Sequence, residues 1–224
     1  MRTGLFKAAA AAVLIAASAG AATASTVTVS YQGSNAFGTD YSDVGQVKFK
    51  STDPSRSGTF YAGPFAVTAD GLGDFLAWCV NIARNMANGK TYTHAADHFG
   101  GAGSEIRTNI DRLFSTYYAS LETKNQKAAF QFALWEIIYD DGLDLGAGTF
   151  KDNGTNGAIR SLADGYLSGI QSDAALSGRY KFTFLTSTDS QDLVTVSPIP
   201  LPAAGWLLLA GVAGLAGLRR RART

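Results

Sequence analysis

The chain has 224 residues and a formal net charge of +1, with 19 lysines and arginines against 18 acidic residues. All 18 acidic residues but only 13 of the basic ones lie between residues 25 and 197, so this central part carries a net charge of −5. It is long enough for one domain with a real core, and it lacks the basic excess that binding to nucleic acid requires. No nucleic-acid partner is therefore expected.

The N-terminal segment has the three parts of a secretory signal peptide. Arg2 and Lys7 precede an apolar core, and small residues follow up to Ala24. This pattern predicts a signal peptide over residues 1–24, cleaved before Ser25, which directs the chain out of the cytoplasm. A short buried helix at the N-terminus is the alternative interpretation.

The C-terminal segment, residues 198–224, combines a proline motif, an uncharged run and a cluster of arginines. The uncharged run, residues 203–218, would reach roughly 24 Å as a helix, which makes it a marginal transmembrane span. The arginines are expected to stay in the cytoplasm and to leave the preceding domain outside. The candidate sorting residues are Pro200, Leu201, Pro202, Arg219, Arg220 and Arg221.

This tail resembles the VPLPA variant of the PEP-CTERM sorting signal, with Ile199 where the motif has valine. The resemblance implies a Gram-negative exported protein whose tail is recognised and cut by an exosortase-type membrane protease. The chain would be anchored transiently in the inner membrane and then be released, or be retained in the periplasm or the cell envelope. A plain single-pass anchor is the alternative.

Residues 25–197 are expected to form one domain that begins and ends with β-strands. Strand patterns run from residue 25 to residue 67, with turns at 33–35 and 53–55, and a nearly continuous apolar run at 75–82 predicts a central strand. Two final strands, at 179–187 and 192–197, are expected to pair with the first ones.

Three helices are predicted between these strands. The first is capped by Ser104 and ends near Ser120, the second begins near Thr123 or Asn125 and ends at Asp140, and a weaker third covers residues 158–170. Residues 85–103 and 143–157 are rich in glycine and are predicted to be loops. The order predicts an α+β fold, an antiparallel β-sheet or sandwich with an inserted helical block.

Cys79 is the only cysteine of the chain. In an exported protein a single cysteine has no partner for an internal disulfide. Cys79 is therefore a buried inert thiol, a reactive thiol or one half of an intermolecular disulfide.

Gln131 shares an apolar face of the second predicted helix with Leu134, Trp135 and Ile138. Burying its amide without a partner would cost on the order of 1–3 kcal/mol. Gln131 is therefore hydrogen-bonded, close to a boundary or chemically used. A thiol held beside such an amide can expel ammonia and form a thioester.

The segments around these two residues resemble the thioester domains of Gram-positive surface adhesins. Residues 78–80 are similar to the aromatic-Cys-aliphatic element and residues 131–135 to the Gln-x-Ala-Ile-Trp element, although Phe130 stands where that family has threonine. The resemblance implies a thioester-domain-like fold in which Cys79 and Gln131 form the bond, without enzyme activity, cofactor or metal. The bond would attach the protein to amine or hydroxyl groups on a surface, a matrix or a neighbouring cell. The residues expected to support the motif are Trp78, Ala133, Leu134 and Trp135.

Two other interpretations stay open. Cys79 and the helix of Gln131 can be ordinary core, with the amide capping a strand edge, in a non-reactive extracellular or exopolysaccharide-associated structural protein. A cysteine hydrolase would use Cys79 with His94 or His98 as its base. Both histidines are expected on the surface without a metal, and Glu136 is expected to be solvated.

Overall fold

The computed structural model describes residues 26–172 and 174–199. The predicted signal peptide lies outside the described residues, and so does the predicted sorting signal from residue 200 onward. Among the helices that the structure describes, none has the length and apolar character needed to cross a membrane.

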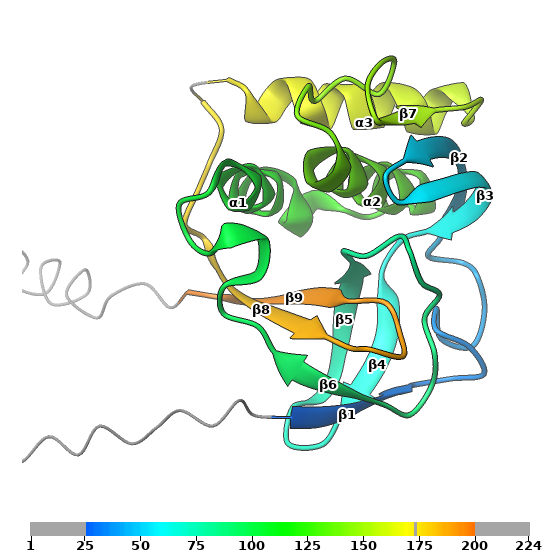
Figure 1. Cartoon of the computed structure of the whole chain (residues 1–224), viewed down its shortest axis with the longest axis vertical. Helices are drawn as coiled ribbons and strands as arrows, with labels where there is room; N and C mark the ends of the chain where they lie inside the picture. Colours follow the sequence, from blue (N-terminus) through cyan, green and yellow to red (C-terminus); the bar gives the residue numbers. More distant parts are fainter. Residues whose placement is uncertain (1–25, 173, 200–224) are drawn as a thin grey trace, which may run out of the picture.

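Six strands close into an antiparallel barrel in the order β1-β4-β5-β9-β8-β6 (Figure 1). Alternate side chains point into it, so that Val29, Val67, Ala77 and Leu193 are buried. Strands β8 and β9 pair with β6 and β5, which confirms that they join the same sheet as the first strands. The bounds are β1 Thr26–Tyr31, β4 Phe65–Ala69, β5 Gly73–Cys79, β6 Lys90–His94, β8 Tyr180–Thr186 and β9 Leu193–Pro198.

A separate three-stranded sheet has the order β3-β2-β7, with β2 at Gly45–Thr52, β3 at Ser55–Ala62 and β7 at Phe150–Asp152. Strands β2 and β3 form a hairpin in which Thr52 pairs with Ser55, so the predicted turn is confirmed. Along β2, buried residues alternate with exposed ones, and the buried side chains of Val47 and Phe49 belong to the core.

Three α-helices gather on one side of the barrel: α1 Glu105–Tyr117, α2 Lys124–Tyr139 and α3 Gly157–Ile170 (Figure 1). Short 3-10 turns lie at His98–Gly100 (η1) and Tyr118–Ser120 (η2). The predicted cap of α1 is confirmed, because the Ser104 side chain accepts from Arg107 N. Helix α2 begins near Thr123 as expected, and Thr123 also forms a capping box with Gln126. The α+β class and the antiparallel pairing are thus confirmed.

Helix α2 lies at the centre of the helical block, where it packs against α1, α3 and the small sheet. Every residue from 128 to 137 is buried. The sequence predicted a single apolar face for this helix. The structure shows instead that α2 has neighbours on all its sides.

Three local predictions were wrong in detail. Strand β6 lies in the predicted loop 85–103, and β7 lies in the predicted loop 143–157. Both strands are short and have weak local sequence patterns, and they form because β6 pairs with β1 and β7 pairs with β2. The strand predicted at 75–82 begins at Gly73 and ends at Cys79.

Candidate functional site

Cys79 is the last residue of β5, where this strand pairs with β9 and Cys79 faces Leu193 in the register. Its side chain is 1% exposed. The residues that follow are held in place by Tyr139, whose hydroxyl accepts from Ile82 N at 3.0 Å and donates to Val80 O at 3.2 Å. Cys79 therefore lies at a rigid strand end.

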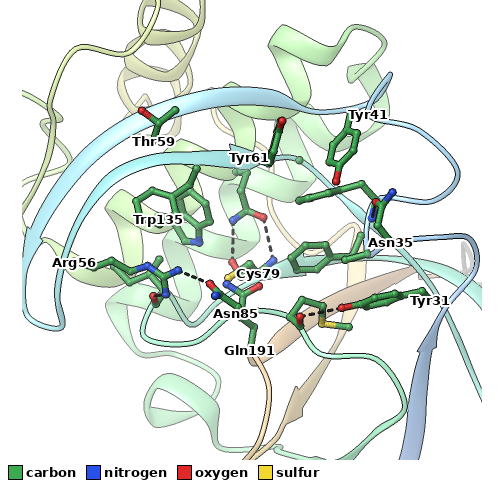
Figure 2. A pocket seen from close by; sticks show the side chains of 18 of the residues that line it. Tyr31, Asn35, Tyr41, Arg56, Thr59, Tyr61, Cys79, Asn85, Trp135 and Gln191 are labelled. Carbon is green, nitrogen blue, oxygen red and sulfur yellow. Dashed lines mark hydrogen bonds between the residues drawn. The ribbon is translucent and has the colours of Figure 1, made fainter.

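Gln131 lies in the middle of α2 and is also 1% exposed. Its Oε1 accepts from the Cys79 N–H at 3.0 Å, and its Nε2 donates to the Cys79 carbonyl oxygen at 2.8 Å. Figure 2 draws both bonds as dashed lines at Cys79. The carboxamide thus pairs with the strand end as a neighbouring backbone amide would, and the structure brings together the two residues that the sequence singled out.

The thiol of Cys79 donates to the carbonyl oxygen of Asn81 at 3.3 Å. Burial raises its pKa to about 12, while the Asn81 backbone, the Trp135 indole and the charge of Arg56 act in the opposite direction. The sulfur is therefore a neutral thiol at physiological pH, and any nucleophilic use of it requires that its proton be removed during the reaction.

Cys79 and Gln131 both line a cavity of about 390 Å³ that opens to the surface (Figure 2). Eight of its twenty lining residues are aromatic. Tyr41 and Tyr61, 46–47% exposed, pack against each other with tilted rings whose centroids lie 4.6 Å apart. A molecule of modest size can therefore approach the buried pair. The aromatic lining residues are Tyr31, Phe37, Tyr41, Phe49, Phe60, Tyr61, Phe65 and Trp135.

The predicted supporting residues lie in two places. Trp135 lines the cavity and packs on Phe49, with 5.5 Å between ring centroids. Ala133 and Leu134 are fully buried in the core, away from the cavity lining. Trp78 packs on Phe130 and is likewise absent from the lining.

Sequence reasoning missed Arg56 and Tyr139. Arg56 comes from β3, stacks over Phe60 with its guanidinium carbon 4.7 Å from the ring centroid, and donates to Asn85 Oδ1 and to the Ile82 carbonyl oxygen at the cavity wall. Tyr139 follows Trp135 by one helical turn, a spacing that was a usable signal for a shared face. No local pattern marks Arg56, because only the packing of the hairpin places it here.

Glu136 is buried, and the prediction that it is solvated was wrong. Its side chain is fully buried and neither carboxylate oxygen has a hydrogen-bond partner among the described residues. Burial, with the charge of Asp140 as the next cause, raises its pKa to about 8. Glu136 was expected to face solvent because it lies on a different side of the helix from Gln131. Since α2 is buried on every side, that side is also covered by protein.

Neither histidine lines the cavity of Cys79. His94 is the last residue of β6, and His98 is half-buried between Phe99 and Phe184, where burial lowers its pKa. Within residues 26–172 and 174–199, no cluster of three or more histidine, cysteine or acidic side chains has the arrangement of a metal site.

The fold and site define an α+β protein in which a buried cysteine and a buried glutamine meet in an aromatic cavity. No protein-family model and no curated protein matches the chain. Among solved structures, the N-terminal domain of the Streptococcus pyogenes pilus tip adhesin Cpa is similar over 76% of this chain and 98% of that one, with 14% identity and a TM-score of 0.40.

Two further solved structures are similar. The N-terminal thioester domain of a surface protein from Clostridium perfringens matches over 69% of this chain and 100% of that one, with 12% identity and a TM-score of 0.40. The Bacillus anthracis TIE protein matches over 78% of this chain and 39% of its own, with 10% identity and a TM-score of 0.38. Because these similarities are distant, the function proposed below rests on the residues of this chain.

Proposed function

We propose that Cys79 and Gln131 form an internal thioester, and that the chain is an exported cell-envelope protein that uses this bond for covalent attachment. The Cys79 sulfur attacks Cδ of Gln131, the S–C bond forms, the C–N bond breaks and the thiol proton leaves with the nitrogen as ammonia. An amine or hydroxyl group of a surface, matrix or neighbouring cell then displaces the sulfur, which leaves an amide or ester on residue 131 and a free thiol.

The pair of hydrogen bonds between Gln131 and Cys79 carries this proposal. The bond from the Cys79 N–H to Oε1, at 3.0 Å, withdraws electrons from the carbonyl that must accept the attack and can stabilise the oxyanion that follows. The amide belongs to a helix and the thiol to a strand, so both groups are already held in position. The reaction therefore costs little conformational entropy. The bond from Nε2 to the Cys79 carbonyl, at 2.8 Å, must break as ammonia leaves.

The intact mass of the purified protein tests the reaction. We expect the wild-type chain to be lighter than its sequence by one ammonia and its thiol to resist alkylation, whereas Cys79→Ala and Gln131→Ala each have their full sequence mass. Methylamine is expected to add to the wild type and to free the thiol. A wild-type chain of full mass with a free thiol would exclude the thioester.

A non-reactive extracellular structural protein is the second candidate. The observation in its favour is that the backbone of Cys79 satisfies both polar ends of the Gln131 amide, which accounts for a buried glutamine without any reaction. The same mass measurement separates the two candidates, since only the thioester removes ammonia.

The export route is a separate part of the proposal, supported by the sequence of the two termini. A signal peptide over residues 1–24 would deliver the chain across the inner membrane, and the segment 198–224 would hold it there until an exosortase-type protease cuts near the proline motif. Fractionation of cells that express the full chain, or a chain ending at residue 197, tests this route. We expect only the full chain to appear first in the inner membrane.

A further inference from the structure

Trp135 carries a polar group that packing does not explain. Its Nε1–H is buried and has no hydrogen-bond partner among the described residues, and the whole side chain is 4% exposed. Leaving a donor unpaired in the interior is costly, so such a group calls for an acceptor that the resting geometry does not supply. A phenylalanine would supply aromatic contact with Phe49 without that cost.

The indole lies in the same cavity as both residues of the proposed reaction. Trp135 follows Gln131 by four residues on α2, so the two side chains lie on one face, a single turn apart. Both line the cavity together with Cys79. Figure 2 shows the indole nitrogen turned toward Cys79, with the ring of Trp135 lying along the cavity wall.

We propose that the Trp135 Nε1–H is a catalytic donor that stabilises negative charge on the Cys79 sulfur, an inference that rests on the proposed thioester. The charge develops twice. It grows on the sulfur as its proton departs for the leaving nitrogen. It grows again when an acceptor breaks the S–C bond, because the electron pair of that bond then goes to the sulfur.

The environment of the sulfur supports this role. Burial raises the pKa of the Cys79 thiol, whereas the Trp135 indole lowers it, which is the direction expected of a donor directed at the charged form. The Asn81 carbonyl oxygen accepts from the thiol at 3.3 Å, and the Asn81 backbone also acts to lower the pKa of the thiol. In a buried site a fixed donor is more effective than it would be in water, because it needs no reorganisation.

Trp135→Phe tests the proposal, and Trp78→Phe is its matched control. Trp78 also has a buried indole N–H without a partner among the described residues, and it packs on Phe130 outside the cavity lining. Both variants therefore lose one buried indole, and only the first loses the donor at the sulfur. A third variant carries 3-benzothienylalanine at position 135, which keeps the two-ring shape without the N–H.

Two rates are measured in the full mature chain of each variant. The first is the release of the thiol by methylamine, followed by intact mass. The second is the alkylation of the freed Cys79 thiol by iodoacetamide across the pH range in which circular dichroism shows the protein folded. We expect Trp135→Phe and the benzothienyl variant to lose roughly tenfold or more in the first rate relative to Trp78→Phe. We also expect their alkylation to begin at higher pH.

Equal methylamine rates for Trp135→Phe and Trp78→Phe, or a benzothienyl variant as fast as the wild type, would overturn the donor role. A wild-type chain that never loses ammonia refutes the thioester instead, and its thiol is then free from the start. In that case the alkylation profile decides alone: an upward shift with Trp135→Phe supports the donor, and an unchanged profile overturns it.

Discussion

The carboxamide of Gln131 pairs with the backbone of Cys79 through two hydrogen bonds, of 3.0 Å and 2.8 Å, across 52 positions of sequence. This relationship joins the helical block to the end of strand β5. It satisfies a buried N–H and a buried carbonyl of the strand, so it contributes to stability as well as placing the amide beside the thiol.

Gln131→Glu is expected to destabilise the protein at neutral pH. One carboxylate oxygen can accept from the Cys79 N–H, but the other then faces the Cys79 carbonyl oxygen without a proton to donate. Below the pKa of the introduced acid, the protonated form can donate there and restore the pairing. We expect the loss in free energy of unfolding, about 1–3 kcal/mol, to shrink as the pH falls. Denaturant titrations at pH 4 and pH 7 measure it, and an equal loss at both would contradict the pairing.

Glu136 is expected to make the stability fall as the pH rises. Burial raises its pKa in the folded state to about 8, from 4.5 for an ordinary glutamate, so the unfolded chain releases this proton at lower pH than the folded one does. The stability contributed by the neutral acid is complete below pH 4.5 and is lost as the pH rises to about 8. Glu136→Gln removes this dependence.

The measurement is the melting temperature of the wild type and of Glu136→Gln across that pH range. We expect the melting temperature of Glu136→Gln, relative to that of the wild type, to increase steadily as the pH rises. The exposed residue Glu122, replaced in the same way, is the control and should show no such trend. Parallel curves for Glu136→Gln and the wild type would show that Glu136 ionises freely.

Thr123→Ala is expected to cost about 1 kcal/mol in the free energy of unfolding, because the Thr123 side chain caps α2 and completes a capping box with Gln126. Ser104→Ala removes the corresponding cap of α1 and should cost a similar amount. Only α2 carries Gln131, so Thr123→Ala alone should also slow the loss of ammonia. Urea unfolding measures the stability, and a time course of intact mass measures the rate of ammonia loss. Equal rates of ammonia loss in Thr123→Ala and Ser104→Ala would show that the cap of α2 does not affect the reaction.

Arg56 is expected to select acceptors by charge, if the thioester forms. It is the one charged side chain among the described residues that line the cavity, and its acceptors at Asn85 and Ile82 are neutral. An amine with a neighbouring carboxylate, such as β-alanine, should therefore react several-fold faster than 1,4-diaminobutane, which carries a second positive charge. Arg56→Gln should remove most of this preference, and so should high salt. Competition between the two amines, read by mass, measures the ratio.

Much of the secondary structure was predictable because its signals are local. Ser104 caps α1 as the sequence indicates, α2 begins near Thr123 as expected, and the predicted turn at 53–55 joins two strands. Strands β6 and β7 escaped prediction, since they are short and owe their pairing to β1 and β2. The exposure of Glu136 was predicted wrongly for a related reason. The helical repeat gives the positions of side chains around the helix axis, but the neighbouring elements decide which side of the helix faces water.

The sequence by itself determined that the chain has a single cysteine, that a glutamine lies in a strongly apolar helix, and that helices are inserted between two groups of strands. These features depend on composition and on interactions between residues close in the chain. Only the tertiary structure decided that Cys79 and Gln131 touch, that Trp135 and Arg56 join them at one cavity, and that Glu136 is buried. Closing a barrel and packing a helix on all its sides are long-range events, and their energy comes from surfaces that no local pattern specifies.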